Sequence, residues 1–307
     1  MTAIRNVFII GAGAMGAAYA AMFTDAVGFY VSFVARGKRY DRLEKETFSI
    51  NDRLYRIPVV HADKISEPAD LILVALKHYH LDGAVGDIAA LTGEDTAILS
   101  VMNGLESEKI IGGTCGMSKL VYAIAVGIDA VHEHGRFTFA NPGKIVFGPI
   151  ANGTSGPDLE RIQEALNRAG IDNEIPADIM RAMWWKFMLN VGINQASAVL
   201  RAPYRVFQTS ADARELMQAL MQEVVAIAGK AGIDLNQNDL DEFSPMLMTF
   251  APGGKTSMLQ DVEAGRKTEV EIFAGKVIES GQAYGVPTPV NATIHQIIKV
   301  IESRSGV

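Results

Sequence analysis

Residues 7–23 read VFIIGAGAMGAAYAAMF, and this stretch decides the fold of the first half of the chain. The apolar, β-branched run 7–10 predicts a buried strand, and residues 17–23 predict a helix. The turn between them has the form G-x-G-x-x-G, which permits a tight turn, close backbone approach to a pyrophosphate and close packing of helix on strand. A dinucleotide is therefore predicted to bind here, the alternative being a glycine turn without a ligand. The predicted ligands are Gly11, Ala12, Gly13, Ala14, Met15 and Gly16.

The same alternation of short apolar runs and helix-like stretches continues outward from the motif. It predicts an α/β fold of the Rossmann type, with a mostly parallel sheet covered by helices. Asn51-Asp52 predicts a turn between two strands at the sheet's edge, and residues 141–143, Asn-Pro-Gly, predict a hairpin that joins 136–140 to 144–148 and finishes the sheet. The clearest further strands are residues 30–34, 71–76, 97–102 and 120–128.

The second half of the chain has a different pattern. From about residue 178 the apolar period is helical almost to the end, and strand signals stop. A chain of 307 residues also exceeds what one hydrophobic core usually serves. We therefore expect two domains, a cofactor-binding domain over residues 1–175 and an all-helical domain over 176–307 that carries the substrate and catalytic residues.

The residues after the second predicted strand indicate which dinucleotide binds. About 20 residues beyond the glycines, an Asp or Glu normally holds the ribose 2′-hydroxyl of NAD. No carboxylate occurs from residue 26 to 40, and strand 30–34 leads into Arg36. A guanidinium binds a 2′-phosphate through charge-assisted hydrogen bonds, so NADPH is favoured over NADH. The alternative is a solvated basic loop, and it is the favoured interpretation for Lys38 and Arg39.

Composition excludes several other classes of protein. The net charge of −7 argues against a general binder of nucleic acid or of acidic membranes, which needs clustered Lys and Arg. No apolar run approaches the length of a membrane helix, no secretory signal pattern opens the chain, and no metal-ligand cluster is visible. The single cysteine, Cys115, fits a reducing compartment. We expect a cytoplasmic enzyme with no metal, no nucleic-acid partner and no membrane partner.

Residues 183–194 carry an unusual polar stripe. Lys186, Asn190 and Asn194 recur every four residues and fall within an arc of about 80° on a helix. The rest of the circumference is almost entirely apolar and includes both tryptophans, so the helix should be buried. The stripe must then face a cleft, a partner group or bound water, because unpaired buried amides and ammonium groups are costly. An ordinary solvated face is the alternative.

Two further candidates lie near the C-terminal end. Ser257 stands three residues before Gln260, the spacing of a capping box, so Ser257 is expected to begin a helix. Its hydroxyl is either an N-cap, the favoured interpretation in isolation, or an anion ligand. Glu269 lies in a predicted helix, 268–278, and in isolation is interpreted as a surface carboxylate. The residues of that helix expected to point inward are Val270, Phe273 and Val277.

Assembled in order, these segments resemble the ketopantoate reductase family over nearly the full chain. The matching pieces are residues 11–16, Ala75-Leu76-Lys77, Asn103-Gly104, the helix from Trp185 to Asn194, and residues 257–262 running on to 267–269. The resemblance implies an NADP-binding domain followed by a helical domain like that of 6-phosphogluconate dehydrogenase. It leaves the oligomeric state open, with a homodimer as one candidate.

The resemblance also implies roles for residues of the helical domain. Lys186 would be the general acid, with Glu269 at the substrate hydroxyl and at Lys186. Asn190 and Asn194 would bind the substrate, and Ser257 would bind its carboxylate.

In the first domain, the resemblance places Asn103 near the nicotinamide and the substrate, and Lys77 near the cofactor and the reacting centre. The chain departs from the family pattern at Gln195, where a proline is usual, at Met102, where a polar residue is common, and at residues 78–80, His-Tyr-His. These departures put the substrate in question more than the reaction type.

The implied activity is NADPH-dependent reduction of 2-dehydropantoate (ketopantoate) to pantoate, a step of pantothenate and coenzyme A biosynthesis. Two alternatives stay open. One is a reductase of another small branched 2-oxo acid on the same scaffold, and the other is a non-catalytic NADPH-binding regulator.

Overall fold

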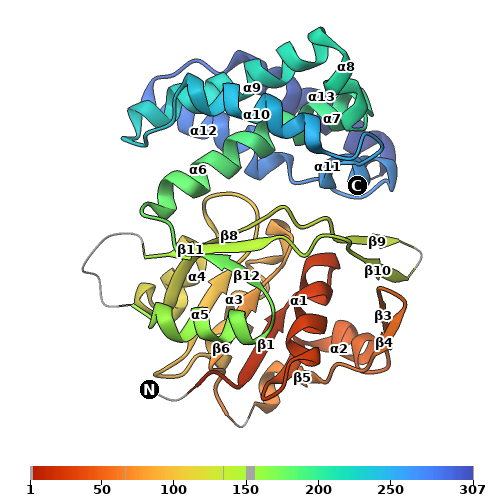
Figure 1. Ribbon diagram of the computed structural model, residues 1–307, viewed down its shortest axis with the longest axis vertical. Helices are drawn as coiled ribbons and strands as arrows, with labels where there is room; N and C mark the ends of the chain where they lie inside the picture. Colours follow the sequence, from red (N-terminus) through yellow and green to blue (C-terminus); the bar gives the residue numbers. More distant parts are fainter. Residues whose placement is uncertain (1–2, 66, 134, 150–155, 307) are drawn as a thin grey trace. The chain divides into compact units, whose positions relative to one another are not determined.

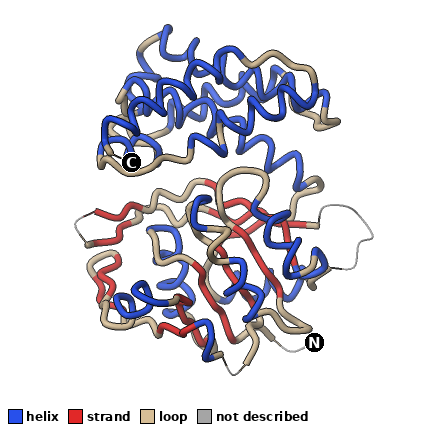
Figure 2. Tube along the Cα trace, turned by 180° about the vertical axis from the view of Figure 1, so that it is seen from behind, coloured by secondary structure: helices blue, strands red, loops and turns tan. Residues whose placement is uncertain are grey.

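The structure is a computed structural model that describes residues 3–65, 67–133, 135–149 and 156–306. The chain divides into two compact units, Met1–Ala182 and Met183–Val307 (Figure 1). The division falls within helix α6 (Ile179–Leu189), shortly after residue 175, where the sequence places the boundary. The first unit mixes strands and helices, as the sequence predicts, whereas every regular element among the described residues from 183 onward is a helix (Figure 2).

The main sheet of the first unit has eight strands in the order β12-β11-β8-β7-β6-β1-β2-β5. From β5 to β8 all neighbours are parallel, while β11 is antiparallel to β8 and parallel to β12. Chain order reverses at β1, which lies between β2 and β6. The strands are β1 (Asn6–Ile10), β2 (Tyr30–Ala35), β5 (Val59–His61), β6 (Leu71–Val74), β7 (Ala97–Ser100), β8 (Leu120–Val126), β11 (Lys144–Gly148) and β12 (Asp172–Glu174).

Helices cover both faces of this sheet. Side chains alternate between the faces along each strand, so Ile9 packs with α1 (Ala14–Asp25) and α5 (Leu159–Arg168), while Ile10 packs with α3 (Val85–Leu91) and α4 (Ser107–Cys115). Every residue of β6 and β7 is buried, as expected for parallel strands covered on both sides. The remaining helices are short: α2 (Gly37–Leu43) and the 3₁₀ turns η1 (Ala62–Lys64), η2 (His78–His80) and η3 (Met117–Lys119).

A second sheet, β4-β3-β10-β9, corrects two expectations. Asn51 and Asp52 do form a turn, with φ of 47° and 60°, between β3 (Phe48–Ile50) and β4 (Arg53–Tyr55). That strand pair belongs to the second sheet, however, and β5 is the edge strand of the main one.

The predicted hairpin across residues 141–143 is wrong. β10 (Arg136–Thr138) pairs with β9 (Val131–Glu133) and with β3, whereas β11 pairs with β8 and β12. The segment that connects β10 to β11 is bound to Asp129 instead, whose carboxylate accepts from the backbone N–H groups of Ala140 and Asn141 at 2.9 and 2.8 Å. The alternating pattern identified both strands but could not identify their partners.

In the second unit, helix α9 (Ala211–Lys230) is the element against which most others pack. Gly192 faces it closely: a Cβ at this position would lie 2.6 Å from Cγ of Met221 and 3.1 Å from the carbonyl oxygen of Met217. The described elements of this unit after α6 are η4 (Asn190–Asn194, a π-helical turn), α7 (Gln195–Leu200), α8 (Tyr204–Thr209), α10 (Gln237–Thr249), α11 (Ser257–Glu263), η5 (Val270–Ile272, a 3₁₀ turn), α12 (Ala274–Tyr284) and α13 (Pro289–Ser305).

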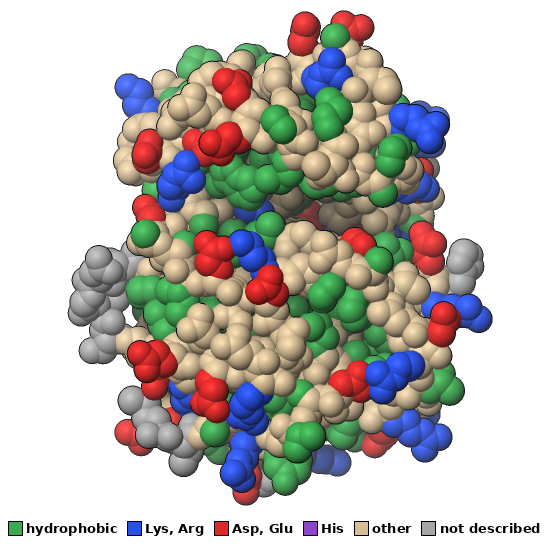
Figure 3. All heavy atoms as spheres, viewed as in Figure 1, with side chains coloured by type: hydrophobic (Ala, Val, Ile, Leu, Met, Phe, Trp, Pro, Cys, Tyr) green, Lys and Arg blue, Asp and Glu red, His purple; other side chains and the backbone are tan. Residues whose placement is uncertain are grey.

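Two further properties of the structure are the distribution of charged side chains on its surface and the apolar character of its helices. On the face shown in Figure 3, acidic and basic side chains are interspersed over each unit. Within the described ranges, no helix combines the length and the apolar character needed to cross a membrane.

Candidate functional site

The three glycines after β1 have different surroundings. A Cβ on Gly11, whose φ is +116°, would lie 2.4 Å from the carbonyl oxygen of Ala75, and one on Gly16 would lie 1.8 Å from that of Gly11. Both are therefore required by the fold itself. Around Gly13 a Cβ would meet nothing within 4 Å, and the φ of Gly13 is an ordinary −83°. Packing and backbone strain thus do not explain the missing side chain of Gly13, whereas close approach by a pyrophosphate would.

Four candidate residues of the first unit follow neighbouring parallel strands. Gly11 follows β1, Arg36 follows β2, Lys77 lies three residues after β6 and Asn103 three residues after β7. Because the carboxyl ends of parallel strands lie at one edge, the topology brings these residues to the same edge of the sheet. The reversal of chain order at β1 makes this edge the crevice in which open α/β sheets bind ligands. Lys77 and Asn103 are half-buried there.

Arg36 is exposed but already has acidic partners. Its Nη1 lies 2.7 Å from Oδ1 of Asp63, and its Nε donates to Oδ1 of Asp87. The hydrogen bond to Asp87 is the main cause that raises the pKa of Arg36, and the charges of Asp87 and Asp63 add to it against a smaller effect of desolvation. A 2′-phosphate would have to compete with two carboxylates for this guanidinium.

A hollow of about 480 Å³ lies against Ala12 of the glycine turn. Sequence reasoning missed it, although Arg42 and Lys45, spaced three residues apart around the end of α2, put two positive charges at its wall. The spacing was the available signal, but it did not show which way these side chains lie. The other lining residues are Glu46, His132, Gly135 and Phe137.

In the second unit, the polar stripe is intact and lies on a mostly buried helix. Lys186 and Asn190 are half-buried, and Asn194 is only 6% exposed. Nδ2 of Asn194 donates to Oδ1 of Asn190 at 3.0 Å. The π-helical turn η4 spans these two asparagines, and such turns often mark functional sites. The expectation of a buried helix with a polar stripe is confirmed.

Ser257 completes this cluster from another helix. Its hydroxyl donates to Oδ1 of Asn194 at 3.2 Å, and the backbone N–H of Met258 points to the same oxygen at 3.5 Å. Ser257 itself is exposed, although its hydroxyl is bound to the amide of the buried Asn194. The structure thus joins Asn190 and Asn194, which lie four residues apart, to Ser257, which lies 63 residues beyond Asn194.

The expected capping role of Ser257 is wrong. The N-cap of α11 is Thr256, whose Oγ1 accepts from the backbone N–H of Leu259 at 3.2 Å. Gln260 does not complete a capping box, since its Nε2 donates to the carbonyl oxygen of Lys255 at 3.3 Å. Because the buried Thr256 satisfies the helix end, the Ser257 hydroxyl is available for the cluster.

Glu269 is 5% exposed, which overturns its interpretation as a surface carboxylate. The predicted helix 268–278 is also interrupted, because the 3₁₀ turn η5 is separated from α12 by Phe273 with φ −103° and ψ −90°. The inward orientation of the three apolar residues is confirmed: Val270, Phe273 and Val277 are all buried. No cluster of His, Cys, Asp and Glu among the described residues could hold a metal ion.

Comparison with protein families gives two matches that follow the division of the chain. Residues 7–152 match the family described as "Ketopantoate reductase PanE/ApbA", and residues 178–302 match "Ketopantoate reductase PanE/ApbA C terminal". Among curated proteins, the chain is 26% identical over 300 residues to a 2-dehydropantoate 2-reductase of Archaeoglobus fulgidus, covering 98% of this chain and 99% of the relative. It is 25% identical to that of Aquifex aeolicus, covering 97% of each.

Solved structures share the fold over the whole chain. D-mandelate dehydrogenase with NADH and anilino(oxo)acetate superposes with a TM-score of 0.89 at 21% identity, covering 98% of this chain and 100% of that one. A dimeric ketopantoate reductase from Staphylococcus aureus gives 0.82 at 20% identity, covering 98% and 99%. At these identities the likeness establishes the fold alone.

Proposed function

The chain belongs to the ketopantoate reductase family of oxidoreductases, and from this premise we propose that it is an NADPH-dependent reductase of small 2-oxo acids. The leading substrate is 2-dehydropantoate, with pantoate as product, which would make the protein a cytoplasmic enzyme of pantothenate and coenzyme A biosynthesis. The curated relatives from Archaeoglobus fulgidus and Aquifex aeolicus support this choice of substrate by their names.

The observation that carries the proposal is the hydrogen-bonded cluster on the polar stripe. Asn190 and Asn194 place amide groups on a helix that is otherwise mostly apolar, and Ser257 of α11 places a hydroxyl group next to them. Such groups suit a small polar anion better than an apolar ligand, because they can exchange hydrogen bonds with a carboxylate and a hydroxyl. Lys186 adds an ammonium group to the same stripe.

The surroundings of Gly13 support a nicotinamide dinucleotide in the first unit. The absence of a side chain at Gly13 leaves space that no protein atom fills, and a pyrophosphate could occupy it. Gly11, Gly13 and the first turn of α1 would hold the pyrophosphate, and Lys77 and Asn103 would face the nicotinamide end. When bound, the dinucleotide supplies the hydride that reduces C2 of the oxo acid.

The remaining chemistry falls to side chains of the second unit. A lysine ammonium is ordinarily protonated at neutral pH, so Lys186 would stabilise the developing alkoxide and then donate a proton to that oxygen. Ser257 would donate its hydroxyl hydrogen bond to the substrate carboxylate. Glu269 would accept from the substrate hydroxyl and from Lys186. The products are then a 2-hydroxy acid and the oxidised dinucleotide.

The choice between NADPH and NADH depends on Arg36. The proposal assigns a 2′-phosphate to this guanidinium, which offers five N–H donors in a fixed fork. The contacts with Asp63 and Asp87 favour the second candidate, NADH, because two carboxylates near the site repel a phosphate. D-mandelate dehydrogenase, which shares the fold, is named with NADH.

One plate of dinucleotide-oxidation assays tests the proposal. The wells combine NADPH or NADH with ketopantoate, 2-oxoisovalerate, pyruvate and phenylglyoxylate, and kcat/KM is measured for each. We expect the highest kcat/KM with NADPH and ketopantoate. A higher value with 2-oxoisovalerate or phenylglyoxylate would assign the enzyme to another 2-oxo acid, and no oxidation with any acid would support the non-catalytic regulator. Light scattering of the same preparation tests whether the protein is a homodimer, the candidate state, like the dimeric ketopantoate reductase from Staphylococcus aureus.

A further inference from the structure

The segment Thr268–Phe273, which contains Glu269, is held at its beginning by a buried carboxylate. Oε1 of Glu302 on α13 accepts from the backbone N–H of Thr268 at 2.8 Å and from its Oγ1 at 2.7 Å. The Thr268 hydroxyl also accepts from the backbone N–H of Val270 at 3.2 Å, so it bridges the residues on either side of Glu269. Thr268 and Glu302 are 2% and 4% exposed, which shields these hydrogen bonds from water.

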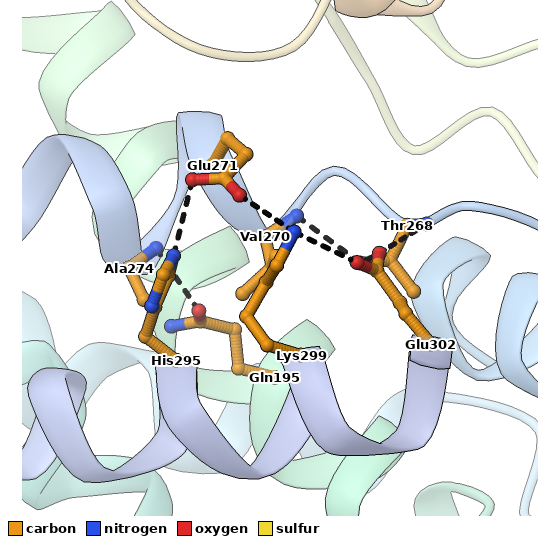
Figure 4. A network of polar contacts seen from close by, with 8 residues as sticks. All are labelled: Gln195, Thr268, Val270, Glu271, Ala274, His295, Lys299 and Glu302. Atoms are coloured by element: carbon orange, nitrogen blue, oxygen red, sulfur yellow. Dashed lines mark hydrogen bonds and ion pairs between the residues drawn. The ribbon is translucent and has the colours of Figure 1, made fainter. Parts of the chain in front are cut away.

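Further charges on α13 hold the same segment (Figure 4). Nζ of Lys299 lies 3.2 Å from Oε2 of Glu302 and 2.9 Å from Oε1 of Glu271, so it joins two carboxylates. The other oxygen of Glu271 lies 3.1 Å from Nε2 of His295. Residues 295, 299 and 302 share one face of α13. Both neighbours of the Glu269–Val270 pair, Thr268 and Glu271, are therefore tied to one helix.

The end of the segment is held by Gln195, the first residue of α7, which continues directly from the helix that carries the polar stripe. Gln195 directly follows Asn194, is completely buried, and accepts from the backbone N–H of Ala274 through Oε1 at 3.0 Å. Its Nε2 donates to the carbonyl oxygen of Val191 at 2.8 Å and to Oδ1 of Asn291 at 3.0 Å. Ala274 is the first residue of α12, and the N-cap residue Phe273 makes no side-chain hydrogen bond to this helix start. A proline at position 195 could make none of these side-chain contacts.

These contacts do more than satisfy buried groups. Glu269 lies inside a short segment with bridge-region backbone angles, φ −101° and ψ 29°, which no regular helix imposes. The two attachments therefore constrain the backbone on both sides of Glu269, and one of them comes from Gln195, which follows Asn194 in the chain.

We propose that Glu302 and Gln195 are positioning residues that fix the Glu269 carboxylate relative to the polar stripe. The inference rests on the proposed function, in which Glu269 acts on the substrate. Neither residue would touch substrate or cofactor.

The test compares Thr268→Val, which keeps the shape but removes the hydroxyl, with Thr268→Ser, which keeps the hydroxyl. Glu279→Gln is the control, since it alters a carboxylate contact of similar kind in the surface pair Lys276–Glu279 by removing its negative charge. Steady-state kinetics with the best substrate of the wild type are measured beside hydrogen exchange of the amides of residues 268–274. We expect a fall in kcat of about tenfold for Thr268→Val, with the KM for the dinucleotide unchanged. Thr268→Ser and Glu279→Gln should stay within about twofold of wild type.

Hydrogen exchange decides the inference independently of activity. Faster exchange at 268–274 in Thr268→Val, restored in Thr268→Ser, is expected. Unchanged exchange would overturn the inference even if the wild type reduced none of the acids tested, an outcome that by itself overturns only the proposed function. Faster exchange with wild-type kcat in an active enzyme would also overturn it, because the contacts would then be structural alone.

Gln195→Leu tests the second attachment. It removes the three hydrogen bonds at similar side-chain size, and we expect the same pattern: faster exchange at 273–274, lower kcat and an unchanged KM for the dinucleotide. Should this variant fail to fold, Gln195→Met, which also removes the three hydrogen bonds and has an unbranched side chain of similar length, provides the same measurement. A folded variant with wild-type kcat would remove Gln195 from the assignment.

Discussion

The two candidate regions are built in opposite ways. At the edge of the main sheet, the candidate site is formed by features that short stretches of sequence encode. These are backbone glycines, a helix end and residues that follow neighbouring parallel strands. In the helical unit, the cluster depends on side-chain hydrogen bonds between residues far apart in the chain, such as Ser257 with Asn194 and Thr268 with Glu302. A candidate dinucleotide site can therefore be recognised from a motif, whereas a candidate substrate site of this kind becomes visible only in the tertiary structure.

The largest expected effect, and the clearest distinction between the contributions of the two regions, comes from Lys186→Ala. The substitution should lower kcat and kcat/KM together by at least about a hundredfold, because general acid catalysis alone is typically worth 10²–10⁴-fold. Binding of NADPH, measured by fluorescence titration, should survive, since the glycine turn lies in the other unit. A folded variant that binds NADPH and keeps more than about a tenth of wild-type kcat would remove Lys186 as the proton donor, and Lys77 would be the next candidate.

The paired variants Ser257→Ala and Thr256→Ala compare ligand binding with capping inside the helical unit. Ser257→Ala should raise the KM for the oxo acid about tenfold, the effect of one lost hydrogen bond to a charged group, with little change in thermal stability. Thr256→Ala should lower stability by about 1 kcal/mol because it removes the cap. Thermal denaturation and steady-state kinetics of both proteins check this. The assignment fails if Ser257→Ala melts early and binds substrate normally.

In the sheet unit, Arg36→Ala should raise the KM for NADPH about tenfold and leave that for NADH nearly unchanged. Asp87→Asn is the matched opposite: removing a carboxylate that holds the guanidinium should lower the KM for NADPH. Both KM values are measured for each variant. Equal use of the two dinucleotides by the wild type would contradict the phosphate site.

The smallest expected effect is on how thermal stability depends on pH when Glu271, which ties the segment Thr268–Phe273 to α13, loses its charge. Burial, the largest single cause, raises the pKa of Glu271, but the hydrogen bonds and the charges of Lys299 and His295 together outweigh it and leave the pKa lowered. A lowered pKa means that the stabilisation is present above the unfolded value of about 4.3 and is lost as pH falls through the folded value. The Tm of Glu271→Gln should therefore lie below that of wild type at pH 6, and the gap should close below about pH 4. A gap that stays constant across this range would contradict the role of the Glu271 charge.

Most of the first unit could be predicted because its signals are local. The strand, turn and helix of residues 7–23 and the turn at Asn51-Asp52 depend on neighbours in sequence. Partner choice was not local, so the strands at 136–138 and 144–148 were paired wrongly. Likewise, the stripe could be predicted from its period, but the burial of Glu269 could not, because it depends on tertiary packing; its neighbour Thr268, for example, is bound by Glu302, 34 residues further along the chain.

The π-helical turn at Asn190–Asn194 makes the length of this helix matter as much as its composition. A π-turn holds surplus chain relative to an α-helix, so a single-residue deletion there could be absorbed by re-forming α-helical hydrogen bonds without unfolding the protein. Because the π-turn accommodates this surplus residue, the side chains beyond the deletion would keep nearly the same orientation relative to Lys186. Insertions of one residue into the α-helical part before the turn, in contrast, would turn both asparagines by about 100° relative to the residues that precede the insertion, a step that substitutions cannot produce. For a laboratory evolving new substrate ranges on this scaffold, they are a class of variation to include in the library.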